Sequence, residues 1–315
     1  MSARETIGVD LGGTKMLVGV VDSDRRVHHE SREASRGMGE EEIVRTLVDV
    51  LEEARSARPD VLAAGLGIPA TIDHGKGIAI NAVNLEITDV PLREIIEKRI
   101  GLPVFVDNDA NVAALAEFLY GAGKGATNLV MLTIGTGIGG GLVLNGELYR
   151  GTVGAGAELG HIVVDENGPP CQGTCPNHGC VETFASGTAL AREGRIAARS
   201  HPDSALAKEK EITGRTVTEA ALAGDHAAAD VVATAGRHLG VALASIANTF
   251  EPDLIAIGGG VSAVGDLLLD PAREELRSRA LPPMNQTRVE VAKLGGDAGM
   301  IGAAAMALIE HDRAG

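Results

Sequence analysis

Two segments with one shared design constrain what this chain can fold into. Residues 7–20 and 131–144 each contain a strand-like run, a turn of glycine and threonine, and a second strand-like run. One segment opens the first half of the chain and the other opens the second half. Two such hairpins facing one cleft would suit a nucleotide held between two related domains. Two unrelated hairpins in a chain with 42 glycines are the alternative.

The chain length and the order of predicted elements also favour two domains. The 315 residues correspond to about two domains of average size. Strands alternate with helices in the first half, which favours a partly parallel sheet. An apolar stripe predicts a helix over 40–56, and a second helical region runs over 216–250 with an interruption at Gly224-Asp225. Residues 194–215 are charged and carry no clear stripe, so we expect an exposed excursion there.

Charge and composition exclude several functional classes. The formal net charge is −15 and tryptophan is absent, whereas nucleic-acid surfaces need clustered Lys and Arg and aromatic stacking platforms. Residues 125–146 lack charged side chains and are long enough to span a bilayer, yet two strands around a glycine turn explain them better. The N-terminal residues contain no apolar signal core. We therefore expect a soluble, cytoplasmic protein without nucleic-acid or membrane partners.

The turn Asp10-Leu-Gly-Gly-Thr-Lys15 carries groups that suit phosphate binding. Glycines let backbone N–H groups approach phosphate oxygens, and the threonine adds a hydroxyl. The Asp10 carboxylate beside them suits a hydrated Mg²⁺. The turn is neither a P-loop nor a Rossmann turn, because the spacing differs and a strand follows it. Taken alone, a tight hairpin explains it more readily.

Polar residues also stand where a buried strand at 104–106 gives way to a helix. Asn108 and Asp109 occupy this edge of the sheet, where ligands usually bind. A simple helix N-cap is the alternative. Glu158, His161 and Glu182 add two carboxylates and an imidazole, groups that hold sugar hydroxyls or lie solvated on a surface.

All three cysteines, Cys171, Cys175 and Cys180, lie in one short loop. With the His161 imidazole they complete the four ligands of a closed tetrahedral Zn²⁺ site. His178 inside the loop is a competing ligand, although we favour His161. A Cys171–Cys175 disulfide with Cys180 free is the alternative, which a reducing cytoplasm disfavours.

Taken together, these motifs resemble those of the ROK family of sugar kinases, within the actin-like ATPase superfamily. The resemblance covers nearly the whole chain and implies an α/β fold of the actin-like, ribonuclease H-like type, with two domains and a cleft between them. It implies a small domain at 1–116, joined by a C-terminal helix at about 300–315, and a large domain with the zinc loop at 117–299. The matching segments, in order, are Asp10–Lys15, Val106–Glu117, Ile134–Gly141, Glu158–His161, Cys171–Glu182 and Gly258–Ser262.

The resemblance also implies roles for individual residues. Asp109 would be the general base that takes the proton of the sugar's 6-hydroxyl. The sugar hydroxyls would be held by Asn84, Asn108, Asp109, Glu158, His161 and Glu182. The nucleotide and its Mg²⁺ would be held by Asp10, Gly12, Gly13, Thr14, Lys15, Gly135, Thr136, Gly137, Gly139, Gly258, Gly259 and Gly260. The structural Zn²⁺ would be held by His161, Cys171, Cys175 and Cys180.

The implied activity is phosphate transfer from ATP to a hexose, with glucose as the leading substrate and glucose 6-phosphate as the product. N-acetylglucosamine, N-acetylmannosamine and fructose remain alternative substrates, and polyphosphate remains an alternative donor. A homodimer or higher homo-oligomer is expected from the family.

Two other functional classes are weighed against this activity. Repressors of the same family carry an additional helix-turn-helix region, for which the residues before Ile7 leave no room. A non-catalytic sugar-binding protein is the third reading, against which the intact Asp10, Lys15 and Asp109 count. The sequence departs from the family at Ala70, where glycine is common, and in having three residues between Cys171 and Cys175, where one is usual.

Overall fold

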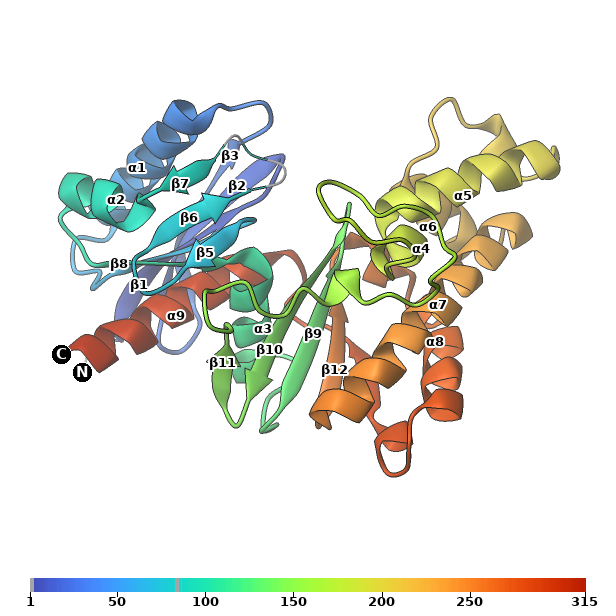
Figure 1. Cartoon of the computed structure of the whole chain (residues 1–315). Coiled ribbons are helices and arrows are strands. Elements are labelled where there is room, and N and C mark those ends of the chain that lie inside the picture. The colour runs from blue at the N-terminus through green and yellow to red at the C-terminus, as the bar shows by residue number, and fades with distance from the viewer. Residues whose placement is uncertain (1–2, 83–84, 86) are drawn as a thin grey trace.

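A computed structural model describes residues 3–82, 85 and 87–315 of the chain (Figure 1). Its first sheet has five strands in the order β3-β2-β1-β4-β8 within these residues. The strands β1 to β3 are antiparallel, while β4 and β8 run parallel to β1. Their bounds are β1 Glu5–Leu11, β2 Lys15–Asp22, β3 Val27–Ala34, β4 Ala64–Ile68 and β8 Val104–Asn108.

The second sheet repeats this topology, with the order β11-β10-β9-β12-β13. Again three consecutive strands are antiparallel and two later strands are parallel to the first. The hairpins β1–β2 and β9–β10 therefore occupy equivalent places, which confirms that the two sequence segments share one design. The bounds are β9 Leu129–Ile134, β10 Ile138–Leu144, β11 Glu147–Tyr149, β12 Leu254–Gly258 and β13 Arg288–Val291.

Two helices connect the two sheets. The helix α9 (Ala298–Ala314) packs on β1 and β4, and α3 (Asp109–Tyr120) packs on α9 and on β10. A Cβ atom at Gly65 would lie 1.9 Å from the carbonyl oxygen of Ala303, so only glycine lets α9 lie this close to β4. The C-terminal end of the chain thereby returns to the first sheet, as Figure 1 shows in red.

The remaining elements cover the outer faces. Helices α1 (Glu40–Ala57) and α2 (Leu92–Ile100) share one apolar core with the first sheet, beside a small sheet of β5, β6 and β7. The second sheet shares its core with the helices that follow it. The bounds are β5 Thr71–Asp73, β6 Ile78–Asn81, β7 Thr88–Val90, α4 Glu182–Ala185, α5 Gly187–Ser200, α6 Gly214–Leu222, α7 His226–Phe250 and α8 Asp266–Arg279.

Most sequence-predicted elements are confirmed, including the break at Gly224-Asp225, where the Asp225 side chain caps α7. The expectation of an exposed excursion over 194–215 holds for most side chains of this segment, but a few of them enter the core. Leu206 is fully buried and Ile212 nearly so, in the core that also holds Val217. Among the residues the structure describes, no helix has both the length and the apolar character needed to cross a membrane.

Candidate active site

A cleft of about 620 Å³ opens between the two sheets. One wall comes from the ends of β4, β6 and β8, and the other from the β9–β10 turn and the loops that follow the second sheet. The lining includes Pro69, Ala70, Thr71, Asn81, Asn108 and Asp109 on the first wall, and Thr133, Gly135, Thr136, Gly137, Gly139, Glu158, His161, Gln172, Cys175, Glu182 and Gly259 on the second.

Asn108 and Asp109 occupy the junction between β8 and α3. The Asn108 side-chain oxygen accepts hydrogen bonds from the backbone N–H groups of Ala110 (2.9 Å) and Asn111 (3.3 Å), so the capping interpretation is correct for Asn108. Its amide also donates to the Ala70 carbonyl oxygen at 3.3 Å. Asp109 lines the cleft at the first position of the helix, where its Oδ1 atom also accepts a hydrogen bond of 2.9 Å from the Ala110 N–H.

The environment of Asp109 makes its carboxylate more basic than an ordinary one. Burial raises the pKa of Asp109, and the nearby Glu158 carboxylate raises it further, although the Ala110 N–H partly opposes the shift. A carboxylate with a raised pKa accepts a proton more readily, which is the property a general base needs.

Glu158, His161 and Glu182 meet on the opposite wall. The His161 Nε2 atom lies 3.9 Å from the Glu158 Oε2 atom. Glu182 begins α4, and its Oε2 atom accepts a hydrogen bond from the Ile138 backbone N–H at 2.8 Å. A Cβ atom at Gly137 would lie only 2.4 Å from the same oxygen, so a larger residue there would displace the Glu182 carboxylate from the turn. The remaining predicted sugar contact, Asn84, lies outside the described residues.

The glycine turn between β9 and β10 is held in place by the start of α5. The Gly187 N–H donates to the Gly135 carbonyl oxygen at 2.7 Å, and the Thr188 hydroxyl donates to the Thr136 carbonyl oxygen at 2.8 Å. Of the second predicted nucleotide turn, Gly259 lines the cleft, whereas Gly258 and Gly260 are not part of the lining.

The β1–β2 turn is not part of this lining, although it was predicted to contact the same nucleotide. Gly12, Gly13, Thr14 and Lys15 form a hairpin turn, closed by a hydrogen bond of 2.8 Å from the Gly12 N–H to the Lys15 carbonyl oxygen. Asp10 lies just before the turn, and its carboxyl interacts electrostatically with the carboxylate of Asp109. Burial raises the pKa of Asp10 to about 6, the Asp109 carboxylate adds to the shift and Lys15 opposes it.

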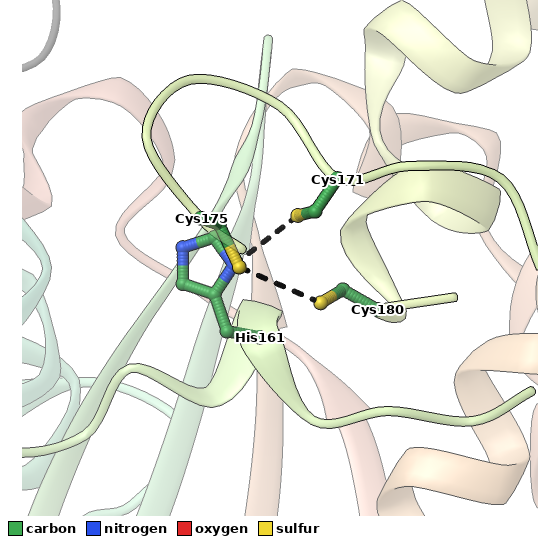
Figure 2. Close-up of side chains that lie close together, drawn as sticks. All are labelled: His161, Cys171, Cys175 and Cys180. Atoms are coloured by element: carbon green, nitrogen blue, oxygen red, sulfur yellow. Dashed lines mark hydrogen bonds between the residues drawn. The ribbon is translucent and has the colours of Figure 1, made fainter. Parts of the chain in front are cut away.

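The three cysteines and His161 converge as predicted (Figure 2). Their ligand atoms all lie within 4.8 Å of one another, with 3.4 Å between Cys171 Sγ and His161 Nδ1 and 3.9 Å between the sulfurs of Cys175 and Cys180. In a tetrahedral zinc site, ligand atoms lie about 3.5–3.8 Å apart, given Zn–S and Zn–N bonds of about 2.3 and 2.0 Å. The donor set and its spacing therefore fit Zn²⁺.

Sequence reasoning missed two polar residues of the first wall, Thr71 and Asn81. They face each other in register on β5 and β6. The alternation around the buried Ile72 and Ala79, with a glycine-containing turn between them, is a hairpin signal that could have found them.

Comparisons with known proteins agree with this geometry. The chain is 39% identical to a glucokinase from Halalkalibacterium halodurans over 96% of this chain and 94% of that protein. It superposes with a TM-score of 0.86 on a ROK family glucokinase from Streptomyces griseus, solved in complex with glucose and AMPPNP, at 38% identity and with coverage of 97% and 99%. The TM-score is 0.90 with a ROK family transcriptional regulator, a homolog of the E. coli MLC protein, at 29% identity and with coverage of 99% and 79%.

These proteins share the actin-like ATPase fold described above, with its repeated sheet and central cleft. The sequence matches the ROK family from residue 6 to residue 310, so this chain belongs to the ROK family.

Proposed function

We propose that this chain is an ATP-dependent glucokinase that converts glucose to glucose 6-phosphate. The observation that carries the proposal is the cleft, in which a basic carboxylate faces a glycine turn across a space of about 620 Å³. The similarity to glucokinases over nearly the full length supports glucose as the acceptor and ATP as the donor.

In this proposal Asp109 accepts the proton of the glucose 6-hydroxyl. The freed oxygen attacks the γ-phosphorus of ATP, the bond to the bridging oxygen breaks, and ADP leaves with that oxygen. Asn108, Glu158, His161 and Glu182 hold the other sugar hydroxyls, because carboxylate and amide oxygens accept hydrogen bonds from neighbouring hydroxyls. The Gly135–Gly137 turn offers backbone N–H groups to the phosphates.

Mg²⁺ would be held at Asp10, where it would neutralise charge on the phosphates of ATP. The Asp10 carboxyl suits this role because it is largely buried beside a second carboxylate, Asp109. Lys15 next to the same turn adds a positive charge. Asp10 and Asp109 thereby offer two neighbouring carboxylates to the cation, although Asp10 itself is not part of the cleft lining.

Zn²⁺ would be held by His161, Cys171, Cys175 and Cys180. Four protein ligands saturate a tetrahedral ion, so the site is structural. It would fix His161 through Nδ1 and leave Nε2 facing Glu158 and the sugar. Cys180 lies two residues before Glu182, so the same ion would also tie down the start of α4.

The deciding experiment measures ADP release from purified protein with a panel of sugars and both donors. Glucose with ATP is expected to give the highest kcat/KM, above N-acetylglucosamine, N-acetylmannosamine, fructose and polyphosphate. A glucose-6-phosphate dehydrogenase readout identifies the phosphorylated position. Sugar binding without ADP release from any sugar would instead identify a non-catalytic sugar-sensing protein, the class suggested by the regulator with the same fold.

We further propose that the protein is a homodimer or higher homo-oligomer that acts in the cytoplasm, where its ATP is available. Light scattering coupled to size-exclusion chromatography checks the first statement, and a monomeric mass would contradict it.

A further inference from the structure

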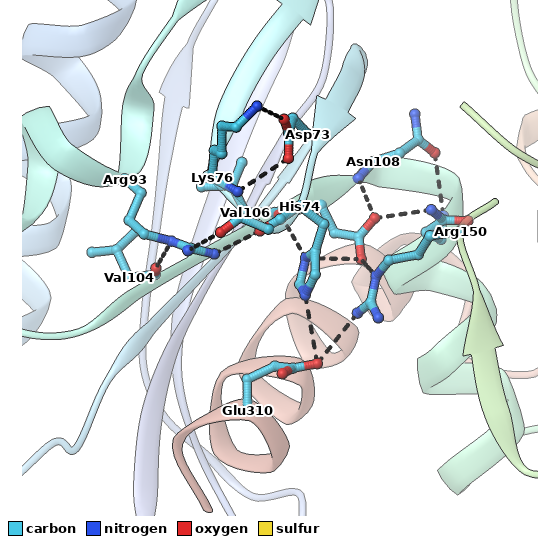
Figure 3. Close-up of polar contacts among 12 residues, drawn as sticks. Asp73, His74, Lys76, Arg93, Val104, Val106, Asn108, Arg150 and Glu310 are labelled. Atoms are coloured by element: carbon cyan, nitrogen blue, oxygen red, sulfur yellow. Dashed lines mark hydrogen bonds and ion pairs between the residues drawn. The ribbon is translucent and has the colours of Figure 1, made fainter. Parts of the chain in front are cut away.

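A cluster of charged side chains lies behind the cleft, next to Asp109 in sequence but outside the cleft lining. Asp107 is the residue before Asn108, and its side chain is only 2% exposed. Arg150 is the residue after β11 of the second sheet. Its Nε atom donates a hydrogen bond to Asp107 Oδ2 at 2.5 Å. Figure 3 shows Arg150 between the end of β8, which carries Asp107 and Asn108, and Glu310 of α9. The Glu310 Oε1 atom is 3.5 Å from Arg150 Nη2.

The second oxygen of Asp107 organises the junction that carries the proposed base. Its Oδ1 atom accepts hydrogen bonds from the Asn108 backbone N–H at 2.8 Å and from the Asn111 side-chain amide at 2.9 Å. These two donors bracket Asp109 in the chain. A shift of the Asp107 carboxylate therefore shifts the end of β8 and the first turn of α3 together.

Arg150 is the cation that holds this buried carboxylate. The His74 Nδ1 atom is 3.7 Å from Asp107 Oδ2 and has a shorter contact of 3.0 Å with the Val106 carbonyl oxygen. The guanidinium of Arg150 is thus in closer contact with Asp107 than the imidazole is. A buried carboxylate that loses its cation is expected to move toward water or to take up a proton.

Arg150 also begins the loop that leads to the opposite wall. Its carbonyl oxygen accepts a hydrogen bond of 3.0 Å from the Gly156 N–H, which closes the loop shortly before Glu158. One residue therefore connects the strand end behind Asp109 with the chain segment that brings Glu158 to the sugar.

We propose that Arg150 is a positioning residue for the phosphoryl transfer. By fixing Asp107, the Arg150 side chain aims Asp109 at the sugar hydroxyl, while the backbone carbonyl of Arg150 closes the loop that precedes Glu158. The inference rests on the proposed function, in which Asp109 is the base. Neither Arg150 nor Asp107 lines the cleft, so their effect is expected mainly in kcat, with little change in nucleotide affinity.

The test compares Arg150→Met, Arg150→Lys and Asp107→Asn with the wild type. Arg150→Met is expected to lower kcat with glucose about 10- to 100-fold, because a displacement of about 1 Å at a reacting group has an effect of that size. Arg150→Lys keeps the charge but not the planar fork, so it is expected to restore the thermal unfolding midpoint without restoring kcat. The Kd of an ATP analogue is expected to stay within about twofold in every variant.

Glu310→Gln is the matched control, since it changes a charged neighbour of Arg150 that does not contact Asp107. Its kcat is expected to stay within about twofold of the wild type, because its ion pairs are long. The double variant of Asp107→Asn and Arg150→Met is expected to lose no more activity than the worse single variant, as for two residues that act as a unit.

Several results would overturn the inference. They are wild-type kcat in Arg150→Met, recovery of kcat together with stability in Arg150→Lys, or additive losses in the double variant. If Arg150→Met does not fold, Arg150→Lys and Asp107→Asn decide the question. A wild-type protein that phosphorylates no sugar would overturn the proposed function, and the inference with it, whereas an active wild type with unaffected variants overturns the inference alone.

Discussion

Replacing Asp10 with asparagine is expected to stabilise the ligand-free protein above pH 6 while it abolishes turnover. The pKa of Asp10 is raised from 3.8 to about 6, chiefly by burial and further by the Asp109 carboxylate. Well below the unfolded-state pKa of 3.8 the carboxyl is protonated in both the folded and the unfolded chain, so it contributes nothing. Between about pH 4 and 6 the folded protein holds this proton more tightly, so the free energy of unfolding falls as the pH rises.

The size of the change in the free energy of unfolding follows from the shift in the pKa of Asp10. Each pKa unit corresponds to about 1.4 kcal/mol, so ionised Asp10 lowers the free energy of unfolding by up to about 3 kcal/mol at pH 7.5. Asparagine carries no charge to desolvate and removes this cost. With an unfolding entropy of about 2 cal/mol/K per residue, the midpoint of thermal unfolding is expected to rise by about 4–5 °C at pH 7.5 and to be nearly unchanged at about pH 4.

The assay is urea and thermal unfolding followed by circular dichroism, because the chain has no tryptophan and only two tyrosines. Asp203→Asn, which neutralises an exposed carboxylate away from the cleft, is the matched control and is expected to leave the pH dependence unchanged. If Asp10→Asn is no more stable than the wild type at pH 7.5, then ionised Asp10 does not lower the free energy of unfolding, and the reasoning is refuted.

The remaining predictions concern the base, the metal and the two domains. Asp109→Asn is expected to lower kcat by about 10²–10⁴ and to weaken glucose binding less; retention of more than about a tenth of kcat would remove Asp109 from the base role. Because the pKa of Asp109 is raised, wild-type kcat is expected to fall with decreasing pH at a higher pH than an ordinary aspartate would impose. Purified protein is expected to contain about one zinc per chain, and Cys180→Ser to lose both the zinc and glucose affinity; zinc-free protein with full activity would contradict this. Residues 1–116 with the C-terminal helix are expected to close on residues 117–299, so the radius of gyration measured by X-ray scattering should decrease with glucose and an ATP analogue, and an unchanged value would speak against closure.

The features that sequence analysis predicted well are those with local causes. Glycine turns between apolar runs determine the hairpins β1–β2 and β9–β10 wherever they occur in the chain. The strand end at Asn108 was recognisable because a buried apolar run is followed by capping residues. The Cys/His cluster was recognisable because its cysteines lie in one loop, with His161 a short distance before them.

The features that it missed depend on residues brought together by the fold. Asp107 and Arg150 are 43 positions apart, and no periodicity connects them. Leu206 and Ile212 are isolated apolar residues among charged neighbours, so a stripe was not visible, yet both enter the core beside Val217. The β1–β2 turn lies outside the cleft lining, so its contact with the nucleotide stays a prediction.

The bond from the Ile138 N–H to Glu182 joins the two ends of the cleft mechanically. Glu182 is a sugar contact in the proposed function, while one of its oxygens supports the turn beside Gly137. In the proposed function, an exchange of Glu182 to accept another sugar would also disturb the phosphate end, so acceptor choice and donor handling would change together. Engineering of a broader sugar range is therefore better directed at Thr71 and Asn81, on the wall that leaves this turn untouched.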